Sequence, residues 1–145
     1  MYRNILIATD GSELAQKAVD HGLAIAKGLG SKVTVVTVTE MMSTQSGMLM
    51  PRAVDVDRYE AEARTAARSI LEKAAEASKA AGIPCDVVHV ADMTPAEGVL
   101  ATTRTKGCDL VVMASHGRRG LNRLLLGSHA QEVMVHSSVP VLVCR

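Results

Sequence analysis

The sequence predicts an α/β fold in which helices cover both faces of an open, five-stranded parallel sheet. Five short runs rich in Val, Ile and Leu alternate with segments long enough to form helical crossovers, which is the pattern of parallel strands joined through helices. The first and fourth runs are almost entirely apolar, as strands covered on both faces are. The chain has 145 residues, of which 48% are apolar. This suits a single domain, residues 1–145, with a substantial core.

The first strand is predicted at Asn4 to Thr9, and the first helix follows from about Ser12 to Leu29. Small and apolar residues recur along this helix at helical spacing, and glycines near its end are typical of a helix C-terminus. The members of this stripe are Leu14, Ala18, Gly22, Ile25 and Leu29. The second strand is predicted at Val33 to Val38. The Met-rich segment from Met41 to Asp55 is interpreted as a disordered loop or, alternatively, as a mobile lid or an adaptable partner surface.

The second helix has its own stripe and is expected to end before Gly82 and Pro84. The members of the stripe are Tyr59, Ala63, Ala66, Ile70, Ala74, Ala77 and Ala81. The third strand is predicted at Asp86 to Val90. A third helix opens with the letters TPAE, in which Thr94 would cap the helix, Pro95 would stand in its first turn and Glu97 would complete a capping box.

The fourth strand is predicted at Asp109 to Ala114, and the fourth helix opens with SHAQ, where Ser128 and Gln131 have capping-box spacing. The fifth strand is predicted at Val139 to Cys144. Because Pro140 lacks a backbone donor, this strand is expected at an edge of the sheet. An apolar edge needs cover. Pairing with the same strand of a second copy would supply it and make a homodimer; the alternative is an edge covered within a monomer.

Composition excludes several functional classes. The net charge is +1, with 16 basic and 15 acidic residues, so the charge balance does not indicate a nucleic-acid or membrane-surface partner. Aromatic residues are scarce, which argues against a protein that stacks single-stranded bases. No apolar run is long enough to span a membrane, and the first residues do not resemble a signal peptide. The three cysteines show no paired spacing, so we expect reduced thiols in a cytoplasmic protein.

Two polar stretches follow strands of the predicted sheet and indicate a ligand site. Thr9 to Ser12 reads TDGS after the first strand, and Ala114 to Ser128 reads ASHGRRGLNRLLLGS after the fourth. In open parallel sheets, ligands collect beyond the carboxyl ends of the strands. Gly117 and Gly120 let backbone approach a ligand, and Gly127 with Ser128 stands at a helix start, where amide groups favour an anion. A polyphosphate therefore fits, whereas the alternative is a plain connection between a strand and a helix.

Each of several side chains near these stretches has two possible roles, one in ligand binding and one in the structure. Asp10 is a candidate for magnesium or a ribose hydroxyl, or it caps the first helix with Glu13 at capping-box spacing. Ser128 offers its hydroxyl to phosphate or caps its own helix. His116 reaches a phosphate or is a hydrogen-bonded structural residue. The basic side chains near the ligand either contact phosphate or form a solvated surface: Arg118, Arg119 and Arg123. Neither the P-loop nor the G-x-G-x-x-G pattern is present.

The sequence resembles the universal stress protein family. The resemblance covers essentially the whole chain and is carried by three stretches: ILIATDGSELAQKAV, VVMASHGRRGLNRLLLGSHAQEV and VPVLVCR. It implies an adenine nucleotide alpha hydrolase-like fold with strand order 3-2-1-4-5, in which the first and fourth strands are neighbours. It also implies a dimer through strand five.

The resemblance further implies which residues bind a nucleotide. The ATP-binding branch of the family carries G-x2-G-x9-G-[ST], and this chain matches it at Gly117, Gly127 and Ser128 but has Ala114 at the first glycine. The turn after the third strand keeps Pro95 but lacks the family's glycine. The resemblance places adenine against Ala8, Thr9 and Val38. The full set of candidate nucleotide-binding residues is Ala8, Thr9, Asp10, Val38, Met113, Ala114, His116, Gly117, Arg118, Gly127, Ser128 and His129.

The sequence-based hypothesis is therefore a small cytoplasmic, homodimeric stress protein that binds ATP with Mg²⁺, the metal lying near Asp10, and acts as a regulator. No P-loop lysine is present, and no carboxylate besides Asp10 is suited to position a water. Two alternatives stay open. One is a dimeric interaction module without nucleotide, and the other is a slow ATPase.

Overall fold

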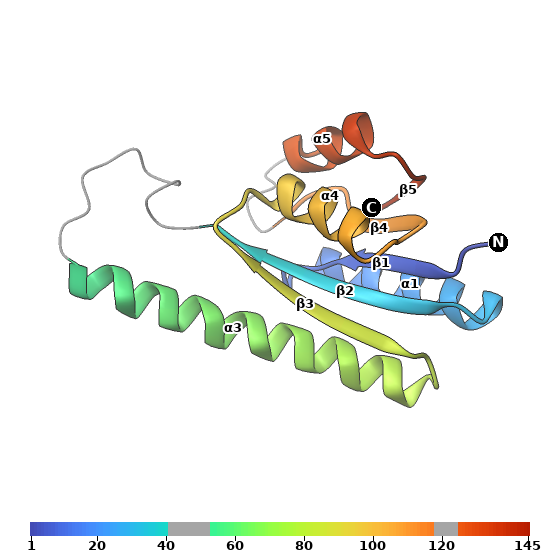
Figure 1. Ribbon diagram of the computed structural model, residues 1–145, viewed down its shortest axis with the longest axis horizontal. Coiled ribbons are helices and arrows are strands. Elements are labelled where there is room, and N and C mark those ends of the chain that lie inside the picture. The colour runs from blue at the N-terminus through green and yellow to red at the C-terminus, as the bar shows by residue number, and fades with distance from the viewer. Residues whose placement is uncertain (41–52, 118–124) are drawn as a thin grey trace.

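The structure of the chain is a computed structural model that describes residues 1–40, 53–117 and 125–145. Five parallel strands form one sheet in the order β3-β2-β1-β4-β5 (Figure 1). The predicted fold class and strand order are confirmed. The strands are β1 (Asn4–Ala8), β2 (Lys32–Thr39), β3 (Cys85–Ala91), β4 (Leu110–Ala114) and β5 (Val141–Cys144).

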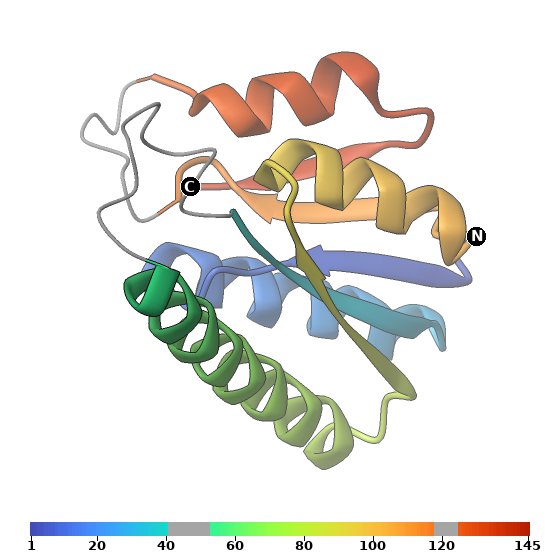
Figure 2. The same ribbon diagram turned by 60° about the vertical axis from the view of Figure 1, so that its left-hand side comes forward.

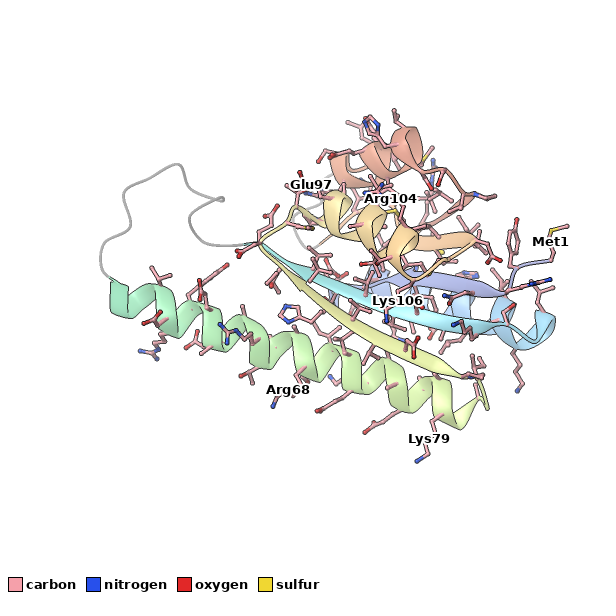
Figure 3. The ribbon with its side chains drawn as sticks, in the orientation of Figure 1. Met1, Arg68, Lys79, Glu97, Arg104 and Lys106 are labelled. Carbon is pink, nitrogen blue, oxygen red and sulfur yellow. The ribbon has the colours of Figure 1, made fainter. Side chains whose placement is uncertain are left out.

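Helices cover both faces of the sheet, as the sequence predicts. They are α1 (Glu13–Leu29), α3 (Ala53–Ala80), α4 (Pro95–Thr105) and α5 (Ser128–His136). The α1 and α3 helices pack on one face, and α4 and α5 pack on the other (Figure 2). On α3, Arg68 and Lys79 project away from the sheet (Figure 3), as expected of a helix that buries one side.

The core has two layers because successive side chains of a strand point to opposite faces. Along β1, Ile5 and Ile7 pack with the α1 and α3 side, whereas Leu6 packs with the α4 and α5 side. All three side chains are fully buried. This explains why the first strand is almost continuously apolar in the sequence.

Both predicted helix stripes are partly wrong. The predicted stripe on α1 includes Leu29, but this side chain is 49% exposed. The buried face of the helix is therefore centred on other residues. The face that packs on the sheet consists of Ala15, Ala18, Val19, Gly22, Leu23 and Ala26. On α3, Ala66 is exposed and its neighbour Ala67 is buried. This helix begins at Ala53, so the end of the segment predicted to be irregular is helical. Its remainder, residues 41–52, lies outside the described residues.

The β5 strand lies at an edge of the sheet, as Pro140 predicts. The strand begins at Val141, one residue after the proline, and the Pro140 carbonyl accepts a hydrogen bond from the Val111 amide at 2.9 Å. All three cysteines are free thiols, as expected, and burial raises the pKa of the Cys108 thiol above its ordinary value. Within the described residues, no helix has the length and apolarity needed to cross a membrane.

Candidate functional site

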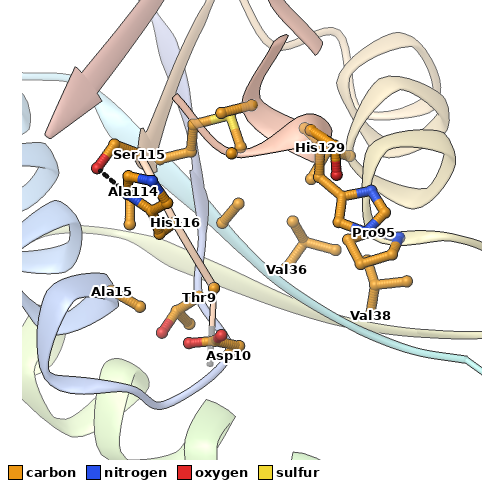
Figure 4. Close-up of a pocket in the computed structure, with 17 residues that line it drawn as sticks. Thr9, Asp10, Ala15, Val36, Val38, Pro95, Ala114, Ser115, His116 and His129 are labelled. Atoms are coloured by element: carbon orange, nitrogen blue, oxygen red, sulfur yellow. Dashed lines mark hydrogen bonds between the residues drawn. The ribbon is translucent and has the colours of Figure 1, made fainter. Parts of the chain in front are cut away.

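A cavity of about 410 Å³ lies at the carboxyl edge of the sheet, beside β1 and β4 and next to the starts of α4 and α5 (Figure 4). Every candidate site residue that the structure describes lines it: Ala8, Thr9, Asp10, Val38, Met113, Ala114, His116, Gly117, Gly127, Ser128 and His129. The two polar stretches identified in the sequence therefore meet at one pocket. Arg118 lies outside the described residues, as do Arg119 and Arg123.

The turn after β1 is held by its own side chains. The Gly11 amide donates to Thr9 Oγ1 at 3.2 Å, and the Ser12 amide donates to Asp10 Oδ1 at 2.9 Å. Gly11 has a positive φ of 80°, which glycine adopts without steric cost. Ser12 is the N-cap of α1, since its hydroxyl oxygen accepts from the Ala15 amide. The prediction that Asp10 caps this helix is wrong, and its carboxylate instead orders the turn beside the pocket.

The segment after β4 brings two further polar side chains to the same place. Ser115 is buried, and its Oγ is 3.0 Å from His116 Nδ1. His116 is thus hydrogen-bonded, as one of its two readings expects, and it also lines the cavity. A β-carbon added to Gly117 would lie 3.2 Å from Asp10 Oδ2. The loops after β1 and β4 therefore contact each other at Asp10 and Gly117.

Gly127 is required by close backbone packing. Its amide donates to the Ser115 carbonyl at 2.8 Å, and an added β-carbon would lie 2.7 Å from the same oxygen. That distance is below any ordinary contact, so another side chain at this position must displace the backbone. Because its amide is already bonded, Gly127 can help an anion only by bringing the next residues close to it. This bond joins residues twelve positions apart, and no local pattern of the sequence predicts it.

The start of α5 differs from the other helix starts at the pocket. Side chains cap α1 through Ser12 and α4 through Thr94, whose predicted capping box with Glu97 is confirmed. In contrast, α5 has Gly127 as its N-cap and no side-chain cap hydrogen bond. The prediction of a box formed by Ser128 and Gln131 is wrong: Ser128 is already inside the helix, and the Gln131 side chain donates to the Leu126 carbonyl at 2.9 Å.

The first turn of α5 consequently borders the pocket with amides that precede the hydrogen-bond ladder of the helix. The Gln131 amide donates to the Gly127 carbonyl at 3.0 Å, which begins the hydrogen-bond ladder of the helix. The amides of Ser128, His129 and Ala130 precede that ladder, and all three residues line the cavity. Such a turn attracts anions through its amides and the helix dipole.

The rest of the lining is mostly apolar and includes residues that the sequence analysis did not assign to the site. They are Ala15, Val36, Pro95, Val99, Ser115 and Ala130, of which Pro95 belongs to the turn after the third strand that the family resemblance pointed to. Two patterns would have found some of them. Val36 is two residues before Val38 and so faces the same side of β2, and Val99 is one helical turn after Pro95.

The described lining contains one carboxylate, that of Asp10, and no Lys or Arg. No group of three or more His, Cys, Asp or Glu side chains suited to a metal ion occurs among the described residues. The described part of the pocket therefore offers an apolar wall, hydrogen-bonding side chains at one end and the amides of a helix start. A ligand with an apolar, planar part and a negatively charged part fits this arrangement.

Comparison with known proteins identifies the family. A model of the universal stress protein family matches residues 1–145. The chain belongs to the universal stress protein family. Among curated relatives, universal stress protein YxiE of Bacillus subtilis is 29% identical over 149 residues, covering 100% of both chains. A universal stress protein of Thermus aquaticus is 30% identical over 146 residues, also covering 100% of both.

Solved structures of universal stress proteins share the fold. Universal stress protein MJ0577 of Methanocaldococcus jannaschii superposes with a TM-score of 0.84 at 26% identity, covering 99% of this universal stress protein and 96% of that chain. A universal stress protein in complex with cAMP superposes with a TM-score of 0.75 at 27% identity, covering 99% and 97%. The architecture is that of the adenine nucleotide alpha hydrolase-like proteins.

Proposed function

We propose that this universal stress protein binds ATP in the pocket and acts as a cytoplasmic regulator, residues 1–145 working as one domain. The observation that carries the proposal is the first turn of α5, which has no side-chain cap and borders a cavity of nucleotide size. A phosphate there would accept hydrogen bonds from amides and gain from the helix dipole. The relative solved with cAMP supports an adenine nucleotide as the class of ligand.

The roles of the lining residues follow from their chemistry. In the proposed complex the phosphates lie at the amides of Ser128 and His129, near His116 and Gly117. Arg118 adds charge from the adjoining loop. The base lies against the apolar wall formed by Ala8, Val38, Met113 and Ala114, which border the pocket. Thr9 also borders the base, and Asp10 lies on the side of the metal or the ribose.

In the proposed complex, Mg²⁺ binds together with the nucleotide. Mg²⁺ usually binds through one or two carboxylates together with substrate phosphates. Asp10 is the carboxylate of the described lining, so it would complete a coordination shell built mainly by ATP and water. A regulatory role suits such a site better than rapid hydrolysis, because the described lining has no second carboxylate to position a water.

The proposal is tested by removing one amide from the first turn of α5. Ser128→Pro deletes the amide and hydroxyl at the first helical position, where proline is favoured. Gly127 has φ −60° and ψ 150°, which suits a residue that precedes proline. The variant should fold normally. Since a hydrogen bond to a charged group contributes about 1.5–3 kcal/mol, ATP affinity should fall about tenfold or more in calorimetry with Mg²⁺.

Ser128→Ala is the matched control, because it removes the hydroxyl and keeps the amide. It should lose less affinity than Ser128→Pro, and the melting temperatures of both should stay near that of the wild type. Absence of ATP binding by the wild type at millimolar nucleotide would contradict the proposal and favour an interaction module without nucleotide. Equal ATP affinity of Ser128→Pro and wild type would show that the phosphates bind elsewhere.

A further inference from the structure

The described pocket has two chemically different ends. At one end, the Asp10 carboxylate lies beside Gly117, and the His116 ring lies beside Gly127, whose added β-carbon would be 3.7 Å from His116 Cδ2. At the other end, the lining is apolar: Val38 and Pro95 border the cavity, and α4 packs directly on Val38 at Gly98, where an added β-carbon would lie 2.5 Å from Val38 Cγ2. The apolar end is the place for a planar base.

His129 stands at the apolar end. It lies in the first turn of α5, which packs beside α4, and it is exposed while lining the cavity. In Figure 4 its imidazole is drawn on the side of Val38 and Pro95, whereas the His116 imidazole is on the side of Ser115 and Asp10. The two histidines therefore border opposite ends of the pocket.

The pocket otherwise lacks ring side chains on which a base could stack. The sequence has no Trp or Phe, and neither of its two tyrosines, Tyr2 and Tyr59, lines the cavity. Among the described lining residues, His116 and His129 carry the planar unsaturated rings. Histidine is one of the side chains on which nucleobases stack, and stacking contributes about 1–3 kcal/mol per base.

We propose that His129 is a specificity-determining residue, whose imidazole stacks on the nucleobase and distinguishes a nucleotide from a bare polyphosphate. The proposal rests on the proposed function, because it adds the base contact to a phosphate site at the same helix start. The apolar side chains at Val38 and Pro95 contact the base edge and leave its face to the ring. The stacking is independent of hydrogen bonding, so a ring without nitrogen atoms can replace it.

The test compares variants of His129 by titration with ATP and, separately, with inorganic tripolyphosphate. His129→Gln keeps a hydrogen-bonding group but removes the ring, and ATP affinity should fall about tenfold. His129→Phe keeps a ring and should stay within a few fold of the wild type. Tripolyphosphate affinity should be the same in all three proteins, because it has no base. His136→Gln is the matched control, since His136 is an exposed histidine at the far end of the same helix and does not line the pocket.

The proposal is overturned if His129→Gln binds ATP as the wild type does, or if His129→Phe loses as much affinity as His129→Gln. An equal loss of tripolyphosphate affinity in His129→Gln also contradicts the proposal, because the ring would then contact the phosphates rather than the base. These outcomes leave ATP binding by the wild type intact, so they are separable from a failure of the proposed function. Absence of ATP binding by the wild type would overturn both.

Discussion

At the scale of single residues, the contact between Gly127 and Ser115 determines the shape of the pocket. The 2.8 Å hydrogen bond from the Gly127 amide to the Ser115 carbonyl joins the end of β4 to the start of α5. This bond holds His116 and the first turn of α5 on the same cavity. The glycine that the sequence analysis assigned to phosphate therefore has a structural role that needs no ligand.

Substitution of Gly127 should destabilise the protein before any nucleotide is added. In Gly127→Ala the new methyl group must move away from the Ser115 carbonyl, which is 2.7 Å from its ideal position. Overpacking of this kind costs about 1–3 kcal/mol. Thermal unfolding of the ligand-free protein measures the effect.

Gly28→Ala is the control for that measurement. Gly28 lies in α1 with no atom within 4 Å of an added β-carbon, so alanine should stabilise the helix by about 0.5–1 kcal/mol. A Gly127→Ala variant as stable as the wild type would mean that the loop relaxes without cost. The role assigned to the Ser115 contact would then be wrong.

At the scale of elements, the two helix starts on the same face of the sheet show why local signals succeed in one case and fail in another. The Thr94 and Glu97 box was predicted correctly, because both of its hydrogen bonds join residues within one turn. The Ser128 and Gln131 pattern has the same spacing. The Ser128 and Gln131 box does not form because of a tertiary contact. The hydrogen bond to Ser115 fixes Gly127 as the N-cap, so Ser128 lies inside the helix.

The α4 cap should make stability depend on pH. Hydrogen bonds from the Thr94 backbone amide and side chain hold the pKa of the exposed Glu97 below its ordinary value of 4.5. A carboxyl whose pKa is lower in the folded state stabilises the fold above its unfolded pKa and loses that effect as pH falls through the folded value. The melting temperature of the wild type should therefore exceed that of Glu97→Gln near neutral pH. The difference should vanish once the solution is more acidic than the lowered pKa.

Glu132→Gln provides the comparison, because Glu132 is exposed within α5 and away from the helix start. Its melting temperature should follow that of the wild type at every pH. If Glu97→Gln also follows the wild type throughout, the ionised cap contributes nothing measurable.

At the scale of the whole molecule, the outer edge formed by β5 and α5 should join two copies. Apolar side chains remain exposed there: Val135 is 75% exposed, and Leu142 on the edge strand is 37% exposed. Leu142→Lys places a charge on this edge, which should weaken association. Analytical ultracentrifugation should give a dimer for the wild type and a monomer for the variant, with unchanged circular dichroism.

Val87→Lys is a matched change on the opposite edge strand, β3, where Val87 is 46% exposed. It should leave the dimer intact. A wild type that sediments as a monomer, or dissociation caused by Val87→Lys rather than Leu142→Lys, would contradict a dimer through β5.

The sequence predicted the fold and the location of the site more fully than the site's internal contacts. Apolar runs and glycines are local features. The runs predicted the position of each strand within a few residues, and the glycines indicated a site at the loops after β1 and β4. The strand order came from the family resemblance. Contacts between distant residues left no local pattern. The bond from Gly127 to Ser115 and the rotation of the buried face of α1 both depend on how packed elements meet.

The central position of β1 has a consequence for how the chain is made. Ile5 pairs with Val33 of β2 on one side and with Leu110 of β4 on the other. During synthesis from the N-terminus, the first strand leaves the ribosome long before its second neighbour exists. Until then one backbone edge of this strand, whose side chains are apolar, has unpaired N–H and C=O groups that can pair with a wrong strand. Chaperone dependence during translation should therefore be concentrated in the interval before β4 emerges.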